Sequence, residues 1–423
     1  MVGGGVQRRK SVMKAVVFTL GCKVNECESD SLIEGLLRRG YEVSDKLCFA
    51  DVYIVNTCAV TAEAEKKSRQ TVSRILKINP RAKIIFTGCA AQKNPEAFAA
   101  KGDNVLVTGS FNKSAILDAL DKSGVMVSPE SKTFEELLPV RSLRTRTFVK
   151  VQDGCDNFCS YCIIPYLRGR SRSRSPESVL SEIERVNPKE AVINGINLSA
   201  YDYCGQGLTE LMNAISGVSC RIRLGSLEAR VITDEFLTSL KNLKNFARHF
   251  HLSLQSGSDA VLKKMNRKYT AEEYYEKVCL IRKYFPEAGI TTDVIAGFPT
   301  ETDENFRESV EFINKVAFSD IHPFTFSPRK GTAAFNMKDL PPEVKKERLD
   351  ELLKTKARLK SAFIDKIKGK IFSVLFEENK GGFTEGYTDN YVRVFVKDDV
   401  PAGEFKKVII TGETGAGALG DIV

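Results

Sequence analysis

The stretch Val151–Arg174 reads VQDGCDNFCSYCIIPYLRGRSRSR. It carries three cysteines in a C-x3-C-x2-C spacing, namely Cys155, Cys159 and Cys162. Three thiolates on one tight loop can each hold one iron of a cubane 4Fe–4S cluster, which leaves the fourth iron open to bind a substrate or cofactor. The aromatic residue before the last cysteine, Tyr161, suits a cluster whose surroundings must exclude water. The spacing therefore predicts an iron–sulfur site, around which the rest of the chain is organised.

A zinc site is the alternative that the same three thiols allow. Structural zinc takes four protein ligands, and no fourth cysteine or histidine lies nearby in the sequence. The histidines of the chain are all distant from the triplet, namely His249, His251 and His322. The triplet therefore favours the iron–sulfur interpretation.

Composition bounds the class of protein. A length of 423 residues suggests two or three domains, and a hydrophobic fraction of 42% is ordinary for a soluble globular chain. No apolar run reaches membrane-spanning length, and the basic opening before Met13, an alternative start, lacks the apolar region of a signal peptide. Eleven cysteines, an odd number, predict metal ligands in a reducing cytoplasm rather than disulfides. The net charge of +9 fits a polyanionic partner.

The first expected domain, residues 14–135, alternates strands and helices. Its four apolar runs read MKAVVFTLGC, ADVYIVNTC, AKIIFTGC and NVLVTGS. A helix is expected after the third run and at three numbered segments, namely Glu28–Arg39, Ala62–Ile78 and Lys113–Lys122. Short continuous apolar runs between helices indicate an open parallel α/β sheet.

Three of these apolar runs finish at a cysteine, namely Cys22, Cys58 and Cys89. The carboxyl ends of parallel strands meet at one edge of a sheet, so these thiols are expected to converge on a second three-thiolate 4Fe–4S cluster. The alternative is that they are small hydrophobic residues at buried strand ends. Turn formers rather than core residues are expected before them, namely Gly21, Thr57 and Gly88, which favours ligation.

The second expected domain, residues 141–362, follows a polar, charged link. Its six expected strands read FVKVQDG, EAVINGIN, RIRLGSLE, HFHLSLQSG, ITTDVIAGFP and DIHPFTFSP. Helices are expected between most of them, at Pro176–Val186, Asp234–Leu243, Asp259–Met265, Ala271–Tyr284 and Thr302–Val316. Six strands with five main crossovers predict a partial (β/α)6 barrel with its functional groups at the carboxyl strand ends.

Polar residues stand at these strand ends, and a polar barrel mouth can hydrogen-bond a small cofactor. The candidates are Asn194, Gly195, Asn197, Ser226, Glu228, Gln255 and Asp293. Each residue alone could instead cap a helix or shape a turn. Their joint position at strand ends is what predicts cofactor binding.

The cysteine triplet resembles the signature of radical S-adenosylmethionine (SAM) enzymes, and its flanks DGCDNFCSYCIIPYLRGRSRSR resemble the methylthiotransferase branch of that superfamily. The resemblance implies that the open iron chelates SAM, and that one-electron reduction cleaves SAM to a 5′-deoxyadenosyl radical. It also implies an amino-terminal domain whose three cysteines hold an auxiliary 4Fe–4S cluster. The strand-end residues become SAM candidates, although Asn194–Asn197 departs from the usual Gly-Gly-Glu pattern of that loop.

Two further motifs refine the resemblance. TLGCKVN at Thr19–Asn25 and VNTCAVT at Val55–Thr61 resemble the subgroup that modifies N6-threonylcarbamoyladenosine in tRNA. The subgroups that modify isopentenyladenosine, or an aspartate of a ribosomal protein, usually differ after these two cysteines. The motifs therefore favour the threonylcarbamoyladenosine subgroup.

The last expected domain, residues 365–423, follows a long amphipathic basic helix in PPEVKKERLDELLKTKARLKSAFIDKIKGK. Its four expected strands, KIFSVLFEE, GFTEGYTDN, YVRVFVKDD and FKKVIITGE, predict a small antiparallel β-barrel. That layout resembles a TRAM domain, which binds RNA in this family. The candidate RNA-binding residues here are Tyr387, Tyr391, Arg393 and Lys397, although the aromatic rings are equally suited to the core of a small barrel.

Four alternating arginines follow the cysteine loop, namely Arg168, Arg170, Arg172 and Arg174. Such a run is often a solvated loop. Beside an active-site mouth it is expected to hold phosphates of an RNA stem or the SAM carboxylate.

The resemblance implies a tRNA methylthiotransferase that adds a methylthio group to carbon 2 of N6-threonylcarbamoyladenosine at position 37, in the anticodon loop. An unactivated C–H bond lies beyond ordinary acid–base chemistry, so a cofactor must carry the step. An electron donor and a sulfur source are required, and no membrane is expected. The alternatives are the isopentenyladenosine or ribosomal-protein substrates and, more distantly, a non-enzymatic RNA-binding metalloprotein.

Overall fold

The computed structural model describes residues 12–137 and 144–423, which form two compact units. The first unit holds the chain up to Glu130 and a short segment from Glu135, and the second holds Ser131–Phe134 and the chain after residue 140. The predicted boundary between residues 135 and 141 lies partly outside the described residues. The predicted boundary between residues 362 and 365 falls inside one continuous helix, Pro342–Ile367. The three-domain division remains a proposal.

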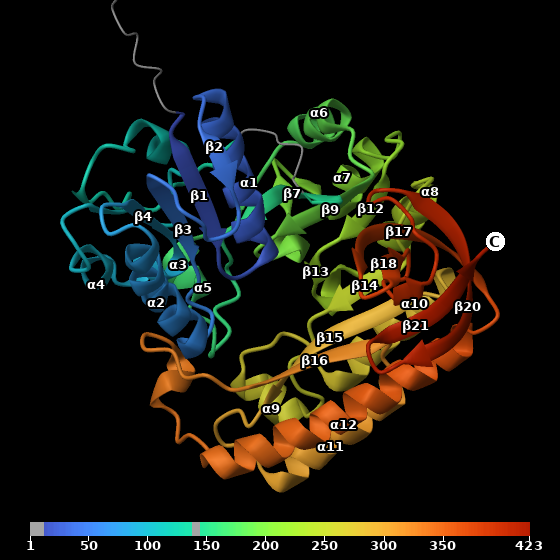
Figure 1. Cartoon of the computed structure of the whole chain (residues 1–423). Helices are drawn as coiled ribbons and strands as arrows, with labels where there is room; N and C mark the ends of the chain where they lie inside the picture. Colours follow the sequence, from blue (N-terminus) through green and yellow to red (C-terminus); the bar gives the residue numbers. More distant parts are fainter. Residues whose placement is uncertain (1–11, 138–143) are drawn as a thin grey trace, which may run out of the picture. The chain divides into compact units, whose positions relative to one another are not determined.

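The first unit contains a six-stranded, wholly parallel sheet (Figure 1) in the order β2-β1-β3-β4-β5-β6. Its strands are β1 (Lys14–Thr19), β2 (Glu42–Ser44), β3 (Val52–Thr57), β4 (Lys83–Gly88), β5 (Val105–Val107) and β6 (Gly124–Val125). The four predicted strands are present, and short β2 and β6 add the two edges. The open parallel α/β sheet is confirmed.

The helices of this unit are α1 (Lys23–Arg38), α2 (Ala62–Ile78), α3 (Cys89–Lys93), α4 (Pro95–Ala99) and the 3-10 helix η1 (Ser114–Asp118). The predicted bounds of α2 are confirmed, whereas α1 begins five residues earlier than predicted. The predicted helix at Lys113–Lys122 is wrong, because only η1 forms there. One turn is enough to bury Ile116 and Leu117 in the core, and the chain must then extend into β6.

The second unit begins with a partial barrel made of two four-stranded sheets, ordered β12-β9-β7-β8 and β13-β14-β15-β16. Its strands are β7 (Arg146–Asp153), β8 (Arg172–Ser173), β9 (Glu190–Gly195), β12 (Arg221–Leu224), β13 (Ser226–Leu227), β14 (His249–Leu252), β15 (Gly289–Ala296) and β16 (Asp320–Thr325), with a small hairpin of β10 (Asp202–Tyr203) and β11 (Gln206–Gly207). The predicted strand RIRLGSLE is broken at Gly225, where a Cβ atom would lie 2.9 Å from Oδ1 of Asn194. All pairings of neighbouring barrel strands are parallel except that of β7 with β8.

Helices cover this partial barrel between the strands. They are α5 (Ile164–Arg168), α6 (Pro176–Val186), α7 (Leu208–Ala214), α8 (Asp234–Asn242), α9 (Asp259–Lys264), α10 (Ala271–Tyr284), α11 (Asp303–Val316) and α12 (Pro342–Ile367), with 3-10 turns η2 (Leu198–Ala200), η3 (Ala229–Val231) and η4 (Ala333–Asn336). The five predicted crossover helices are present, each within one residue of its predicted bounds. Within the described chain, none of the helices combines the length and the apolar character that crossing a membrane requires.

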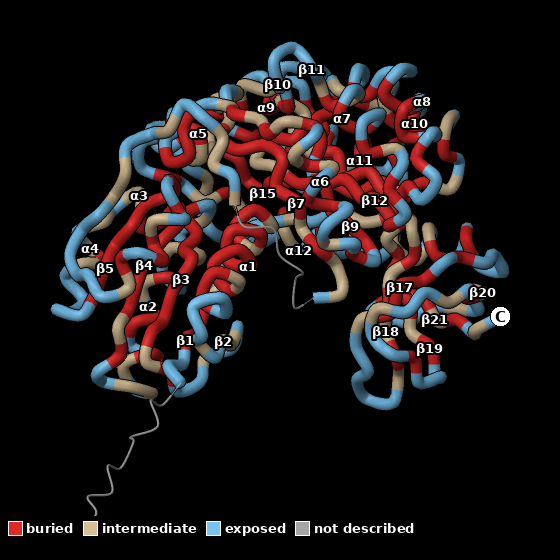
Figure 2. The backbone as a smooth tube through the Cα atoms, turned by 90° about the horizontal axis from the view of Figure 1, so that it is seen from above, coloured by how far each residue is buried: buried red, intermediate tan, exposed pale blue. Residues whose placement is uncertain are grey.

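A closed five-stranded β-barrel follows α12, in the order β17-β18-β19-β21-β20. Its strands are β17 (Ile371–Lys380), β18 (Phe383–Thr388), β19 (Arg393–Val396), β20 (Phe405–Thr414) and β21 (Gly417–Ile422). Strand β21 was not predicted, because four of the six residues in its GALGDI sequence are Gly, Ala or Asp, which are depleted in strands. The small barrel is confirmed, although β21 pairs with β19 in parallel and the barrel is therefore not wholly antiparallel. Figure 2 shows buried residues concentrated in the strands and exposed residues in the loops.

Candidate metal and cofactor site

The cysteine loop begins where β7 ends, at the carboxyl end of the first barrel strand. Gly154 turns the chain at a φ of 74°, and a Cβ atom there would lie 1.9 Å from the carbonyl oxygen of Arg170. Only glycine fits this position. The amide of Cys155 donates to the carbonyl of Gly169 at 3.0 Å and closes the loop. The backbone therefore holds the loop against the segment that follows it.

Burial raises the pKa of the Cys155 thiol and raises the pKa of Cys162 to about 12. The charge of Cys159 raises both further, so the three thiols lie within electrostatic reach of one another. Because thiolates rather than thiols bind metals, loading this loop with iron must release protons.

The donor chemistry of this loop fits a cubane cluster. Among residues 12–137 and 144–423, no three cysteine, histidine, aspartate or glutamate side chains are arranged around a single metal ion. A cubane cluster requires no such arrangement, because each thiolate binds a different iron.

Two buried amides at the carboxyl strand ends have atoms without a hydrogen-bond partner among the described residues. They are Nδ2 of Asn194, at the end of β9, and Oε1 of Gln255, which follows β14 in a left-handed conformation. Both side chains are buried. An unsatisfied buried polar group costs about 1–3 kcal/mol, so these atoms suit a bound polar cofactor such as SAM.

Three more predicted cofactor residues lie at or near the cysteine loop. Asn197 donates from Nδ2 towards Sγ of Cys155 at 3.8 Å. A Cβ atom on Gly195 would lie 2.9 Å from the Gln152 side chain, which explains the glycine. Glu228 accepts a close hydrogen bond from Asn157, inside the loop. These residues join the loop to β9 and to the segment after β13.

The remaining two candidates, Ser226 and Asp293, neighbour His251 instead. Ser226 pairs with His251 in the sheet register, and Oδ2 of Asp293 lies 3.3 Å from Nε2 of His251. His251 stacks on His322 at 5.7 Å, and burial lowers the pKa of His322. Their assignment to SAM remains a prediction.

The end of α9 and the residues just after it also support the loop, and no sequence motif pointed to them. The hydroxyl of Ser160 donates to the carbonyl of Lys264 at 2.8 Å, and Nδ2 of Asn266 donates to the carbonyls of Asn157 and Phe158 at 3.2 and 3.1 Å. Asn266 has a φ of 59°, and asparagine just after a helix is the sequence signal of such a left-handed position. The segment thus supports the loop from a distant part of the sequence.

Three of the four predicted phosphate-binding arginines are buried with acidic partners. The guanidiniums of Arg168 and Arg172 lie 3.2 and 3.6 Å from carboxylate oxygens of Asp153, and Arg174 pairs closely with Glu182. Arg168 ends α5 and Arg172 lies in β8, which pairs antiparallel with the end of β7, so the fold brings both arginines to Asp153. These contacts leave little of the three side chains for an RNA phosphate.

Arg170 differs from the other three. Its side chain is 68% exposed, pairs with Asp156 at 3.1 Å and lies 4.8 Å from the ring of Phe158. The same ring meets the exposed Tyr166 edge-on at 5.4 Å. Arg170 remains the candidate for a phosphate contact beside the cysteine loop.

Tyr391 and Tyr387 pack between the small barrel and the partial barrel. Tyr391 stacks on His249 at 4.4 Å and on Tyr387 at 4.9 Å. The guanidinium of Arg146 lies 4.9 Å from the Tyr387 ring, and that of Arg223 lies 4.7 Å from the Tyr391 ring. Both tyrosine rings thus contact other side chains of this chain. Their stacking on RNA bases remains a prediction.

The other two predicted RNA contacts lie on β19 and just after it. Arg393 is partly exposed and pairs closely with Glu385, and Lys397 is exposed. A cleft of about 580 Å³ between the small barrel and the amino-terminal strand ends is lined by Lys189, Lys244 and Phe405, among others. Both lysines are exposed, so this face also suits an anionic partner.

In the first unit, the three predicted cysteines follow β1, β3 and β4, which are neighbours in the sheet. Cys22 precedes α1, Cys58 follows β3 and Cys89 begins α3. A Cβ atom on Gly21 would lie 3.0 Å from Sγ of Cys58, so the turn before Cys22 touches Cys58. Oδ1 of Asn56, at the same edge, is buried without a hydrogen-bond partner among the described residues. The convergence of strand ends is present, and three thiols there fit a second cubane cluster.

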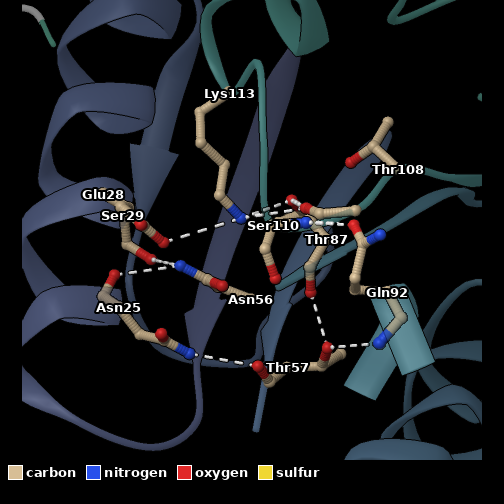
Figure 3. A network of polar contacts seen from close by, with 12 residues as sticks. Asn25, Glu28, Ser29, Asn56, Thr57, Thr87, Gln92, Thr108, Ser110 and Lys113 are labelled. Carbon is tan, nitrogen blue, oxygen red and sulfur yellow. Dashed lines mark hydrogen bonds and ion pairs between the residues drawn. The ribbon is translucent and has the colours of Figure 1, made fainter. Parts of the chain in front are cut away.

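The prediction that turn formers precede these cysteines is wrong for Thr57. Gly21 and Gly88 have positive φ angles, although Gly88 is also the buried last residue of β4, and Thr57 is the fully buried last residue of β3. Its hydroxyl donates to the carbonyl of Thr87 at 2.6 Å. Thr57 therefore belongs to a polar network beneath the cysteine edge (Figure 3).

A buried ion pair forms part of this network. The Lys113 ammonium lies 3.6 Å from the Glu28 carboxylate, and the two side chains are 1% and 0% exposed. The ammonium also donates to Oγ1 of Thr87 at 2.7 Å, as Figure 3 shows. Asn25 donates to the carbonyl of Thr57 at 3.1 Å. The network thus joins α1 to the strands that carry the cysteines.

We expect Lys113→Met to destabilise the first unit by about 3–5 kcal/mol, because the change removes a buried cation from beside the fully buried Glu28 carboxylate. The double variant Lys113→Met/Glu28→Gln should lose much less, since neither charge remains. Amide hydrogen exchange of peptides from β3 and β4 measures the loss of stability in the single and in the double variant. Equal protection in the wild type and in Lys113→Met would show that the ion pair does not stabilise this edge.

Two family descriptions match the chain. Residues 14–109 match the family described as Uncharacterized protein family UPF0004, and residues 149–313 match the Radical SAM superfamily. Among solved structures, the radical S-adenosylmethionine methyltransferase TsrM from Kitasatospora setae has a TM-score of 0.55 at 15% identity and covers 77% of each chain. That likeness concerns the fold alone.

Curated relatives are similar over nearly the whole chain. Threonylcarbamoyladenosine tRNA methylthiotransferase MtaB of Bacillus subtilis is 38% identical and covers 91% of each chain. A tRNA-2-methylthio-N(6)-dimethylallyladenosine synthase of Thermodesulfovibrio yellowstonii is 34% identical and covers 96% of this chain and 98% of its own.

Proposed function

This chain belongs to the tRNA methylthiotransferase family of radical SAM enzymes, and from that premise we propose that it adds a methylthio group to carbon 2 of N6-threonylcarbamoyladenosine at position 37 of tRNA. As a member of this family, the chain is an enzyme that transfers sulfur-containing groups and uses SAM with 4Fe–4S clusters. What we propose beyond family membership is the modified adenosine that the enzyme acts on and the residues that bind the clusters, SAM and tRNA.

One observation carries the proposal. The three thiols of the cysteine loop lie at the carboxyl end of β7. At two other carboxyl strand ends lie Asn194 and Gln255, each with one amide atom that has no hydrogen-bond partner among the described residues. In a barrel of parallel strands this end is where chemistry takes place. The arrangement supports a cluster-bound SAM as the reagent.

The residues of this chain hold and orient the reagents. Cys155, Cys159 and Cys162 would hold the first cluster, which together with SAM supplies the radical that removes hydrogen from carbon 2. Asn194, Asn197 and Gln255 would hydrogen-bond SAM. The buried walls of the barrel would keep water from the reacting carbon.

The first unit would supply the sulfur-bearing centre. Cys22, Cys58 and Cys89 would hold the auxiliary cluster at the sheet edge, where the Lys113 network fixes the strands. An external sulfur source and a one-electron donor complete the reaction. Losing any one of the three thiols should disable this centre, because the three ligands act together.

The partner is tRNA. A base in a single-stranded anticodon loop can be splayed out at little unstacking cost and brought to the barrel mouth. Arg170, Arg393 and Lys397, together with the lysines of the 580 Å³ cleft, are the proposed phosphate-binding residues. Replacing any one of these cations with a neutral residue should make the slope of log affinity against log salt shallower by about 0.7–0.9.

A second substrate has a specific observation in its favour. Relatives that bear the name dimethylallyladenosine synthase are 34% identical to this chain over nearly all of its length. The TLGCKVN and VNTCAVT motifs and the slightly higher identity to the threonylcarbamoyladenosine enzymes favour the first substrate.

Nucleoside mass spectrometry of tRNA decides between the two. In a strain that lacks this gene we expect 2-methylthio-N6-threonylcarbamoyladenosine to disappear and N6-threonylcarbamoyladenosine to accumulate. Restoring the gene should reverse both changes, and a Cys159→Ala copy should reverse neither. Loss of the 2-methylthio-dimethylallyl nucleoside alone would assign the other substrate.

A further inference from the structure

A buried arginine contacts one of the three thiols of the cysteine loop. Nη1 of Arg267 donates to Sγ of Cys159 at 3.4 Å, within hydrogen-bond distance for sulfur. The Arg267 side chain is only 6% exposed. A charge buried this deeply is strongly felt by its neighbours, because little water screens it. Neither the sequence motifs nor the proposed mechanism assigns this arginine a role.

The remaining contacts of Arg267 fix the direction of its guanidinium. Nη2 donates to the carbonyl of Ser253 at 3.1 Å, and Nε donates to the hydroxyl of Tyr269 at 3.1 Å. The chain before it is fixed as well, since Asn266 is hydrogen-bonded to two carbonyls of the cysteine loop. The guanidinium therefore cannot turn away from the thiol without breaking several hydrogen bonds.

Glu228 supplies a nearby counter-charge. Its Oε1 lies 3.5 Å from Nη1 of Arg267, and its Oε2 lies 2.9 Å from Nη2 of Arg230. The Glu228 side chain is 9% exposed, whereas Arg230 is 53% exposed and reaches solvent. Glu228 therefore offsets part of the positive charge that Arg267 presents to the thiol. This gives Glu228 a role other than the SAM contact predicted from sequence.

We propose that Arg267 is a positioning residue that raises the reduction potential of the cluster held by the cysteine triplet, and that Glu228 limits this effect. The inference rests on the proposed assignment of Cys155, Cys159 and Cys162 as cluster ligands. Hydrogen bonds to the sulfurs, net charge and burial are the levers by which a protein sets such a potential.

The direction follows from charge. Reduction transfers one electron from a low-potential one-electron donor to the cluster, and no bond forms or breaks. The added negative charge lies beside the guanidinium of Arg267, which stabilises the reduced form more than the oxidised form. Glu228 acts in the opposite direction. Arg267 thereby brings the potential closer to that of the donor.

The test is an anaerobic redox titration of the full chain, followed by the electron paramagnetic resonance signal of the reduced cluster. A Cys22→Ala/Cys58→Ala/Cys89→Ala background leaves the triplet as the single proposed cluster site. Arg267→Gln should lower the reduced-to-oxidised ratio at a fixed potential at least tenfold, which is about 59 mV for one electron. Arg267→Lys keeps the charge and should restore most of that loss.

Two further variants keep the test decisive. Glu228→Gln should shift the potential upward, because the full charge of Arg267 then faces the thiol. Arg230→Gln is the matched control. It also removes a cation that pairs with Glu228, but solvent screens the charge of Arg230, so the reduction potential should shift much less. Iron content is measured for every variant, so that cluster loss is separated from a change in potential.

The outcomes separate this inference from the proposed function. A chain with intact Cys155, Cys159 and Cys162 that binds no 4Fe–4S cluster would contradict the ligand assignment. An unchanged potential in Arg267→Gln with full iron content would overturn the role of Arg267 alone. Should Arg267→Gln lose its iron, an unchanged or lowered potential in Glu228→Gln would equally overturn it.

Discussion

Cys159→Ala is expected to abolish both 5′-deoxyadenosine formation and methylthiolation of tRNA. The change removes one of three proposed ligands from a loop that is closed by its own backbone, and it removes the sulfur that accepts the Arg267 hydrogen bond. The two remaining thiols cannot hold the cluster in the same way, because each of the three thiolates binds a different iron. The measurement is the yield of 5′-deoxyadenosine and of methylthio nucleoside, side by side, under strong reductant and without oxygen.

Cys220→Ala is the matched control for that loss. Cys220 is also a buried thiol of the second unit, at 6% exposure, but it lies just before β12 rather than in the cysteine loop. Both products should form in this variant at close to the wild-type level. Product from Cys159→Ala, or equal loss in Cys220→Ala, would contradict the ligand role of the triplet.

Cys58→Ala should separate the two cysteine sets. This residue belongs to the other compact unit, so the cysteine loop and its barrel remain intact. We expect continued cleavage of SAM to 5′-deoxyadenosine but no methylthio product, because the proposed sulfur-bearing centre has lost a ligand. The triple variant Cys22→Ala/Cys58→Ala/Cys89→Ala should behave like Cys58→Ala alone, since residues that act as one unit are not additive.

Cys27→Ala provides the control within the same unit. Cys27 is buried in α1 but does not follow a strand of the sheet. Its replacement should leave both products unchanged. Normal methylthio yield from Cys58→Ala would mean that the strand-end cysteines are packing residues, and that sulfur reaches the base by another route.

Local sequence patterns predicted most of the secondary structure. The apolar runs that became β1, β3, β4 and β5 are short, continuous and bounded by turns, which is typical of buried parallel strands. The patterns failed where tertiary context decided the outcome. Lys113–Lys122 forms only η1, and GALGDI becomes β21 because the closing barrel supplies its partners on both sides.

Charge runs were the least reliable guide to the site. The four arginines after the cysteine loop look alike in sequence, yet only Arg170 is exposed, while Arg168, Arg172 and Arg174 are buried against acidic partners. Whether a charged side chain is exposed depends on the acid that the fold places beside it. That acid can lie anywhere in the chain.

The sequence alone predicts the two cysteine sets, because the spacing of Cys155, Cys159 and Cys162 and the position of a cysteine directly after an apolar run are both read from neighbouring residues. It also determined the family, through motifs that sit directly beside those cysteines. Which charges lie beside the cysteine loop depends on three-dimensional packing. Arg267 lies more than a hundred residues from Cys159, and three-dimensional packing alone brings its guanidinium to that thiol, with Glu228 beside it.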